Sequence, residues 1–171
     1  MSRVQLALNV SDLDAAVAFY TKLFATPPAK IRPGYANFAV AEPPLKLVLI
    51  EGAGDPGSLN HLGVEVETTD HVAETTRRLE TEGLATATED QVTCCYALQD
   101  KVWVDDPDGA PWEIYTVLAD AEVPASDVLR ITEPTTAELT TTAPPTTAPS
   151  AAACCSARPD LADQAPATTA S

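Results

Sequence analysis

The chain has 171 residues and a formal net charge of −15, with 25 acidic and 10 basic side chains. This charge argues against a nucleic-acid partner and against an anionic membrane surface, because both attract lysine and arginine. No basic start leads into an apolar stretch, and no apolar run approaches the ~20 residues of a membrane span. We therefore expect a soluble, cytoplasmic protein that binds neither nucleic acid nor membrane.

The first predicted elements are a strand and a helix. Residues 5–10, QLALNV, alternate as a strand does. Ser11 can cap the helix that follows, in which the apolar residues recur on one face. Two further strands are predicted at 35–40 and 45–51, with Glu-Pro-Pro at 42–44 as the turn between them.

The same order of elements begins again near the middle of the chain. HLGVEV at 61–66 repeats the pattern of 5–10. Thr69 or Asp70 can cap the second helix, and Gly83 can end it. Further strands are predicted at 85–88, 101–105 and 112–118, the last two joined through Asp-Pro-Asp-Gly.

This repeat predicts an α+β fold over residues 1–118. Its two βαβββ-like modules, about 1–55 and 58–118, are each too small to bury one face of a sheet. We expect them to pack as one curved mixed sheet around a cleft. Residues 119–171 contain no aromatic side chain and are rich in Pro, Ala and Thr. We expect this segment to be an acidic, mostly disordered tail.

Three polar side chains of the predicted strands are candidates to meet in the cleft. Gln5 occupies in the first module the place that His61 holds in the second. Glu113 lies between Trp112 and Ile114, where a carboxylate is unusual unless something binds it. An amide oxygen, an imidazole and a carboxylate would leave open positions on a divalent metal. Taken alone, a histidine at a strand start is more often a solvated or hydrogen-bonded side chain.

The four cysteines form two adjacent pairs, Cys94–Cys95 and Cys154–Cys155. Consecutive Cα atoms lie ~3.8 Å apart, below the ~4.4–6.8 Å of an ordinary disulfide, so we expect free thiols. Neighbouring thiols suit trivalent arsenic, Cd(II), Zn(II) or Cu(I). Alternatively, Cys94 and Cys95 are small residues packed at a strand edge. Two observations argue against this alternative: alternation would turn only one of the pair inward, and the tail repeats the doublet at Cys154–Cys155.

Three motifs resemble the vicinal oxygen chelate superfamily, which includes glyoxalase I, fosfomycin and bleomycin resistance proteins and extradiol dioxygenases. They are LNVSDLDAAVAFYTKLF at 8–24, HLGVEVE at 61–67 and DDPDGAPWEIY at 105–115. The resemblance covers 1–118 and implies the paired βαβββ modules around a metal cleft. With a cysteine pair at 94–95, the chain resembles the organoarsenical carbon–arsenic lyases, of which cadmium-induced proteins are close relatives.

The resemblance implies that Gln5, His61 and Glu113 bind Fe(II), although Ni, Co, Mn or Zn could occupy the same site. Iron dioxygenases of the superfamily usually carry histidine at the place of Gln5, and a neutral amide is a weaker donor. Cys94 and Cys95 would hold the trivalent arsenic of the substrate. The implied activity is that of a non-heme iron dioxygenase-type lyase, which uses dioxygen to convert methylarsenite or a trivalent aromatic arsenical to arsenite. Such an activity would confer resistance to organoarsenicals.

Two residues near the cysteines are further candidates for the site. Tyr96 could pack against the organic group of the substrate, and Lys101 could offset developing negative charge; each could equally be an ordinary strand or surface residue. Alternative functions are a cadmium-binding resistance protein and a glyoxalase-like or fosfomycin-resistance-like metalloenzyme. The sequence leaves open the oligomeric state, the preferred organic group and whether Cys154–Cys155 delivers substrate.

Overall fold

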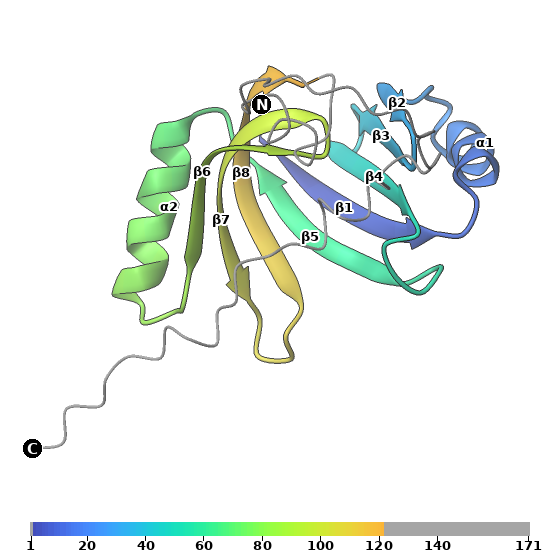
Figure 1. Ribbon diagram of the computed structural model, residues 1–171. Coiled ribbons are helices and arrows are strands. Elements are labelled where there is room, and N and C mark those ends of the chain that lie inside the picture. The colour runs from blue at the N-terminus through green and yellow to red at the C-terminus, as the bar shows by residue number, and fades with distance from the viewer. Residues whose placement is uncertain (1, 122–171) are drawn as a thin grey trace, which may run out of the picture.

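Eight strands and two helices make up residues 2–121, the part of the chain that the computed structural model describes (Figure 1). The strands are β1 (Arg3–Val10), β2 (Lys30–Arg32), β3 (Tyr35–Val40), β4 (Leu45–Glu51), β5 (Leu59–Glu65), β6 (Ala87–Cys94), β7 (Ala97–Asp105) and β8 (Pro111–Asp120). The helices are α1 (Leu13–Phe24) and α2 (Thr69–Thr81). Neither of these two helices is long and apolar enough to span a membrane. Most of the tail expected at 119–171, with Cys154 and Cys155, lies outside the described residues.

All eight strands form one mixed sheet in the order β2-β3-β4-β1-β5-β8-β7-β6. Each half repeats the order strand, helix and three strands. The halves meet where β1 pairs antiparallel with β5, and each of these strands has the last strand of its own half as its parallel neighbour. Figure 1 shows the sheet curving between α1 at one end and α2 at the other. This arrangement confirms the predicted fold class.

The two faces of the first half have different neighbours because side chains alternate along each strand. Leu6, Leu8 and Val10 of β1 pack with α1 in one apolar cluster. Ala7 belongs to a second cluster, with Tyr35, Val48, Ile50 and Tyr96. Gln5 is in phase with Ala7 and therefore points to the face opposite α1.

Each helix is capped by a neighbour of the predicted residues. Asp12, rather than Ser11, caps α1, and its side chain accepts a hydrogen bond of 2.9 Å from the backbone N–H of Ala15. Thr68, rather than Thr69 or Asp70, caps α2. Neighbouring Ser, Thr and Asp residues are all competent caps, so the backbone conformation decides which of them accepts the bond.

Two edge strands differ most from the predictions. The short strand β2 was not predicted. Strand β6 runs to Cys94 instead of ending at 88, with a bulge between Glu89 and Val92. A bulge breaks the two-residue alternation that marks a strand in the sequence, and polar edge strands show this alternation weakly.

Candidate functional site

Three adjacent strands bring the predicted metal ligands together. Gln5 on β1 lies opposite Gly63 on β5, and Gly63 lies beside Glu113 on β8. His61 precedes Gly63 by two residues and therefore points to the same face of the sheet. The three side chains are 3%, 5% and 4% exposed, respectively, so they meet in a buried site.

The ends of the three side chains of this triad lie close together. Gln5 Nε2 lies 3.0 Å from His61 Nε2 and 2.5 Å from Glu113 Oε1. His61 Nε2 lies 3.3 Å from Glu113 Oε1. Neighbouring donors around an octahedral ion with bonds of ~2.1 Å are separated by about 3.0 Å, so two of these three separations are close to those on one face of such an ion. No group of three His, Cys, Asp or Glu side chains suited to a metal occurs among residues 2–121, so the site depends on the amide of Gln5.

Gly63 is a residue of this site that the sequence reasoning missed. A Cβ atom at Gly63 would lie 3.1 Å from Cγ of Glu113 and 3.2 Å from Cβ of Gln5. Neighbouring strands are ~4.8 Å apart, so the side chains of Gln5 and Glu113 must reach toward each other across the whole width of β5. The missing side chain leaves the space in which they meet.

The amide of Gln5 is held from behind by Tyr115. Gln5 Nε2 faces His61 and Glu113, whereas Gln5 Oε1 lies 2.6 Å from the Tyr115 hydroxyl. Burial, and next the Glu113 carboxylate, raise the pKa of Tyr115, so the phenol keeps its proton. Amides bind metals through oxygen, so Gln5 would present Oε1 to an ion and Nε2 to Tyr115. The Tyr115 hydroxyl could then accept from Nε2 and donate to Glu65, 2.9 Å away.

A buried lysine compensates the charge of Glu113. Lys101 is 1% exposed, and its Nζ lies 3.3 Å from Glu113 Oε2. Burial alone would raise the pKa of Glu113, but the Lys101 ammonium and then His61 outweigh it and hold this pKa at about 2. Burial would lower the pKa of Lys101, but the charges of Glu113 and Cys94 raise it. Lys101 is thus a partner of the candidate metal site rather than a surface residue.

The cysteine pair lies at a tight turn between β6 and β7. Strand β6 ends at Cys94 and β7 begins at Ala97, so Cys95 and Tyr96 form the turn, with φ angles of 50° and 63°. The sulfur atoms of Cys94 and Cys95 lie 3.4 Å apart. The expectation that only one sulfur turns inward is wrong, because the positive φ of Cys95 breaks the alternation of the strand.

The turn packs on the face of the sheet that carries the triad. Both cysteines are partly buried against the apolar cluster that contains Ala7 and Tyr35. Tyr96 is 4% exposed, and its ring centroid lies 5.8 Å from that of Tyr35, so Tyr96 belongs to this cluster. Lys30 Nζ donates a hydrogen bond of 2.9 Å to the carbonyl oxygen of Tyr96. The strand β2 therefore helps to fix the turn.

The expectation of free thiols is wrong for Cys95, which is disulfide-bonded. Its partner is not Cys94, because 3.4 Å is far longer than the ~2.05 Å of an S–S bond. Any ligand that bonds to both sulfur atoms at this turn requires Cys95 in its reduced form.

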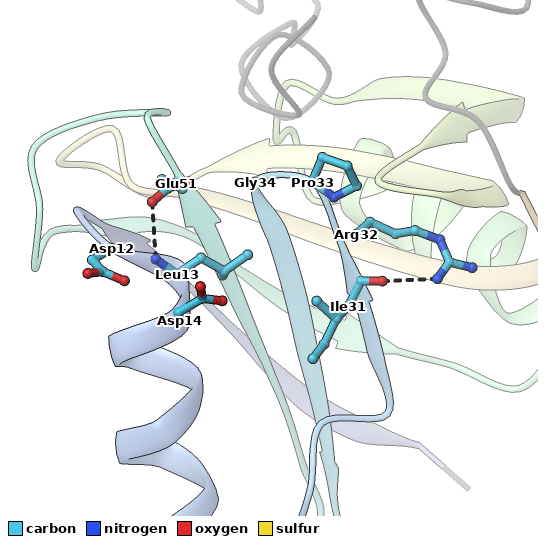
Figure 2. Close-up of a pocket in the computed structure, with 8 residues that line it drawn as sticks. All are labelled: Asp12, Leu13, Asp14, Ile31, Arg32, Pro33, Gly34 and Glu51. Atoms are coloured by element: carbon cyan, nitrogen blue, oxygen red, sulfur yellow. Dashed lines mark hydrogen bonds between the residues drawn. The ribbon is translucent and has the colours of Figure 1, made fainter. Parts of the chain in front are cut away.

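A separate hollow of about 460 Å³ lies at the start of α1 (Figure 2). Its lining residues are Asp12, Leu13, Asp14, Ile31, Arg32, Pro33, Gly34 and Glu51. Two of its carboxylates serve the first turn of α1: Asp12 caps the helix, and Glu51 accepts a hydrogen bond of 3.1 Å from the backbone N–H of Leu13. No predicted site residue lines this hollow, and these two carboxylates stabilise the helix start.

Comparison with known proteins gives several matches to this chain. Residues 3–114 match the family described as "Glyoxalase/Bleomycin resistance protein/Dioxygenase superfamily". A "Trivalent organoarsenical cleaving enzyme" of Thermomonospora curvata is 64% identical over 123 residues, 71% of this chain and 82% of that protein. The "Cadmium-induced protein CadI" of Mycobacterium tuberculosis is 62% identical over 122 residues, 71% of this chain and 80% of that one. The fold resembles the Mn(II)-bound glyoxalase from Novosphingobium aromaticivorans, with a TM-score of 0.53 and 21% identity over 71% of this chain and 42% of that one.

Proposed function

Because the chain belongs to the glyoxalase/bleomycin resistance protein/dioxygenase superfamily, we propose that it cleaves the carbon–arsenic bond of trivalent organoarsenicals and releases arsenite. The relative of Thermomonospora curvata, 64% identical, is named for the cleavage of such compounds. The observation that carries the proposal is the cysteine turn, with two sulfur atoms 3.4 Å apart on the face of the sheet that holds the triad. The substrates of this proposal are methylarsenite and trivalent aromatic arsenicals.

The spacing of the two sulfur atoms suits one trivalent arsenic. A centre bonded to both at ~2.3 Å, a typical bond to thiolate sulfur, would have an angle of about 95° between these bonds for the 3.4 Å separation. Trivalent arsenic is pyramidal with bond angles near a right angle. One organic group and two sulfur atoms complete its three bonds. Reduced Cys94 and Cys95 can therefore hold an R–As unit without a larger cage.

The metal of the proposal is Fe(II), held by Gln5, His61 and Glu113. When bound, Fe(II) would supply the activation of dioxygen next to the captured substrate. The amide, imidazole and single carboxylate of the chain would contribute only one negative charge to the site. Their burial, 3–5% exposed, keeps bulk water away from the reacting groups.

Two further residues have roles in this proposal. Lys101 provides a positive charge beside both Glu113 and Cys94, which raise its pKa, so it can stabilise negative charge that develops near the captured substrate. Tyr96, in the turn beside Cys95, would position the organic group against the apolar cluster. We place the reaction in the cytoplasm, because a reducing compartment keeps the cysteine pair able to bind arsenic.

Arsenic speciation tests the proposal. Reduced protein is loaded anaerobically with Fe(II), given methylarsenite and then exposed to air. We expect arsenite to form only when iron, dioxygen and protein are all present. Cys94→Ser/Cys95→Ser should abolish release, whereas the matched double variant Cys154→Ser/Cys155→Ser should cleave excess substrate normally.

Sequestration of a thiophilic ion is the second candidate, and the 62% identity to a cadmium-induced protein favours it. Its signature is stoichiometric binding of methylarsenite or Cd(II) without any product after air is admitted. That result would refute the lyase proposal while leaving the cysteine turn as a binding site. Full turnover by Cys94→Ser/Cys95→Ser would instead favour a glyoxalase-like activity that does not need the pair.

A further inference from the structure

We propose that Asn60 is a positioning residue that selects the tautomer of His61 able to bind a metal. The inference rests on the proposed metal site and deepens it, because it assigns a function to a side chain outside the triad. Asn60 Oδ1 lies 2.7 Å from His61 Nδ1. An amide oxygen only accepts hydrogen bonds, so this contact places the proton of the neutral imidazole on Nδ1 and leaves Nε2 with its lone pair.

A β-bulge is what makes this contact possible. Consecutive residues of a regular strand point to opposite faces, so Asn60 should point away from His61. The pairing of β1 with β5 shifts here: Ala7 is opposite His61, but Leu8 is opposite Leu59, which leaves Asn60 as the extra residue. The bulge redirects the Asn60 side chain toward the imidazole.

A chain of hydrogen bonds fixes which end of the Asn60 amide faces His61. The Ser58 hydroxyl donates to the backbone carbonyl of Asp55 at 2.6 Å, and this carbonyl can only accept. Ser58 Oγ therefore accepts from Asn9 Nδ2, at 2.8 Å. Asn9 Oδ1 in turn accepts from Asn60 Nδ2, at 2.9 Å, which turns Asn60 Oδ1 toward the ring. Because the Asp55 carbonyl can only accept, it sets the direction of every hydrogen bond in this series.

Gly54 leaves space for the side chain of Asn9 in this series of hydrogen bonds. A Cβ atom at Gly54 would lie 2.8 Å from Asn9 Nδ2, closer than real Cβ contacts. The backbone of the same loop also binds Asn9, because the N–H of Gly57 donates to the Asn9 carbonyl oxygen at 2.8 Å and the N–H of Asn9 donates to the Ser58 carbonyl oxygen at 3.0 Å. The loop between β4 and β5 thus holds Asn9, and through Asn9 it holds Asn60.

Without Asn60, the other side of the ring would compete for the proton. Glu113 Oε1 lies 3.3 Å from His61 Nε2 and would accept a hydrogen bond from a protonated Nε2. That tautomer has no lone pair on Nε2 and cannot bind a metal through it. Metal-binding histidines in proteins commonly donate their other N–H to an acceptor, and loss of that acceptor typically costs ~10–100-fold in metal affinity. Asn60 therefore favours the tautomer that can bind a metal, and in the metal-free protein the Gln5 amide nitrogen, 3.0 Å from His61 Nε2, favours the same tautomer.

The tautomer can be read in the metal-free protein by long-range ¹H–¹⁵N spectra of the imidazoles. The chain has two histidines, and the exposed His71 is a reference within each sample. We expect His61 to be protonated on Nδ1 in the natural protein and to shift toward Nε2 in Asn60→Ala, with His71 unchanged. Asn60→Asp keeps an acceptor and should keep the natural tautomer. An unchanged His61 spectrum in folded Asn60→Ala overturns the inference.

Metal titration gives the second measurement. Anaerobic Fe(II) binding should be ~10–100-fold weaker in Asn60→Ala than in the natural protein. The control Asn37→Ala removes another amide, which donates to the Tyr35 hydroxyl at 2.9 Å, and should bind iron normally. If the natural protein binds no divalent metal, the proposed function fails. The inference about Asn60 is then decided by the tautomer of His61 in the metal-free protein.

Asn9→Ala provides a variant that leaves Asn60 in place. It removes the bond that orients the Asn60 amide, so we expect a mixture of His61 tautomers and an intermediate loss of Fe(II) affinity. If Asn60→Ala does not fold, a natural tautomer and natural Fe(II) affinity in Asn9→Ala overturn the inference.

Discussion

Replacement of Lys101 by methionine would remove a buried charge and keep an apolar side chain of similar length. The Lys101 ammonium lies 3.3 Å from Glu113 Oε2, with 1% of Lys101 and 4% of Glu113 exposed. At an effective dielectric constant of about 20, this separation corresponds to an attraction of about 5 kcal/mol. A shift of the Glu113 pKa from 4.5 to about 2 corresponds to about 3 kcal/mol. We therefore expect the metal-free Lys101→Met protein to lose about 3–5 kcal/mol of unfolding free energy, the range for breaking a buried ion pair.

A divalent metal should reverse part of this loss. The ion would supply the positive charge that Glu113 has lost, and no ammonium would oppose its binding. If the metal restores about 1.4 kcal/mol or more, a thermodynamic cycle requires the variant to bind it at least about tenfold more tightly. The same residue would thus stabilise the empty site and weaken metal binding.

Urea unfolding at neutral pH, with and without Fe(II) under anaerobic conditions, measures both quantities. Lys22→Met is the matched control, because Lys22 is exposed in the last turn of α1, and it should change stability by no more than about 0.5 kcal/mol. Unchanged stability of metal-free Lys101→Met, or weaker metal binding, would refute the compensation of Glu113 by Lys101.

Three further predictions concern the neighbours of the triad. The Gly63→Ala variant should bind Fe(II) less tightly than the natural protein, because the new Cβ would lie 3.2 Å from Cβ of Gln5. Calorimetric titration measures this affinity, and an unchanged affinity would contradict the prediction. Tyr115→Phe removes the hydroxyl 2.6 Å from Gln5 Oε1 and should weaken Fe(II) binding ~10–100-fold in the same titration. The control Tyr35→Phe, at another buried tyrosine, should leave Fe(II) binding unchanged. Equal losses of affinity in both variants would point to a general packing defect. Burial alone would raise the pKa of Glu65, but its cationic neighbours outweigh burial and hold this pKa below its ordinary value of 4.5. The contribution of Glu65 to stability is therefore present above pH 4.5 and is lost as the pH falls through the lowered pKa of the folded protein. The unfolding free energy of Glu65→Gln should therefore depend less steeply on pH in this acid range than that of the natural protein. Acid titrations followed by circular dichroism measure this dependence, and the same slope in both proteins would count against the ion pairs of Glu65.

The sequence alone predicted the repeat of the two modules, apart from the short strand β2, and the strands that carry the triad. Alternation along a strand is a property of the local backbone, so Gln5, His61 and Glu113 could be assigned to one face without coordinates. The similarity of 5–10 and 61–66 indicated two modules that pack as one sheet, whereas the pairing of β1 with β5 is a finding of the structure. That the three side chains bind a metal stays a prediction.

Only the tertiary structure decided where that alternation fails. The bulge at Asn60 depends on the register between β1 and β5. The positive φ of Cys95 belongs to a turn that is fixed by the hydrogen bond from Lys30 of β2. The pairing of Lys101 with Glu113 likewise needs β7 and β8 side by side. Each of these features arises from contacts between residues far apart in the chain, and such contacts leave no periodic pattern in the sequence.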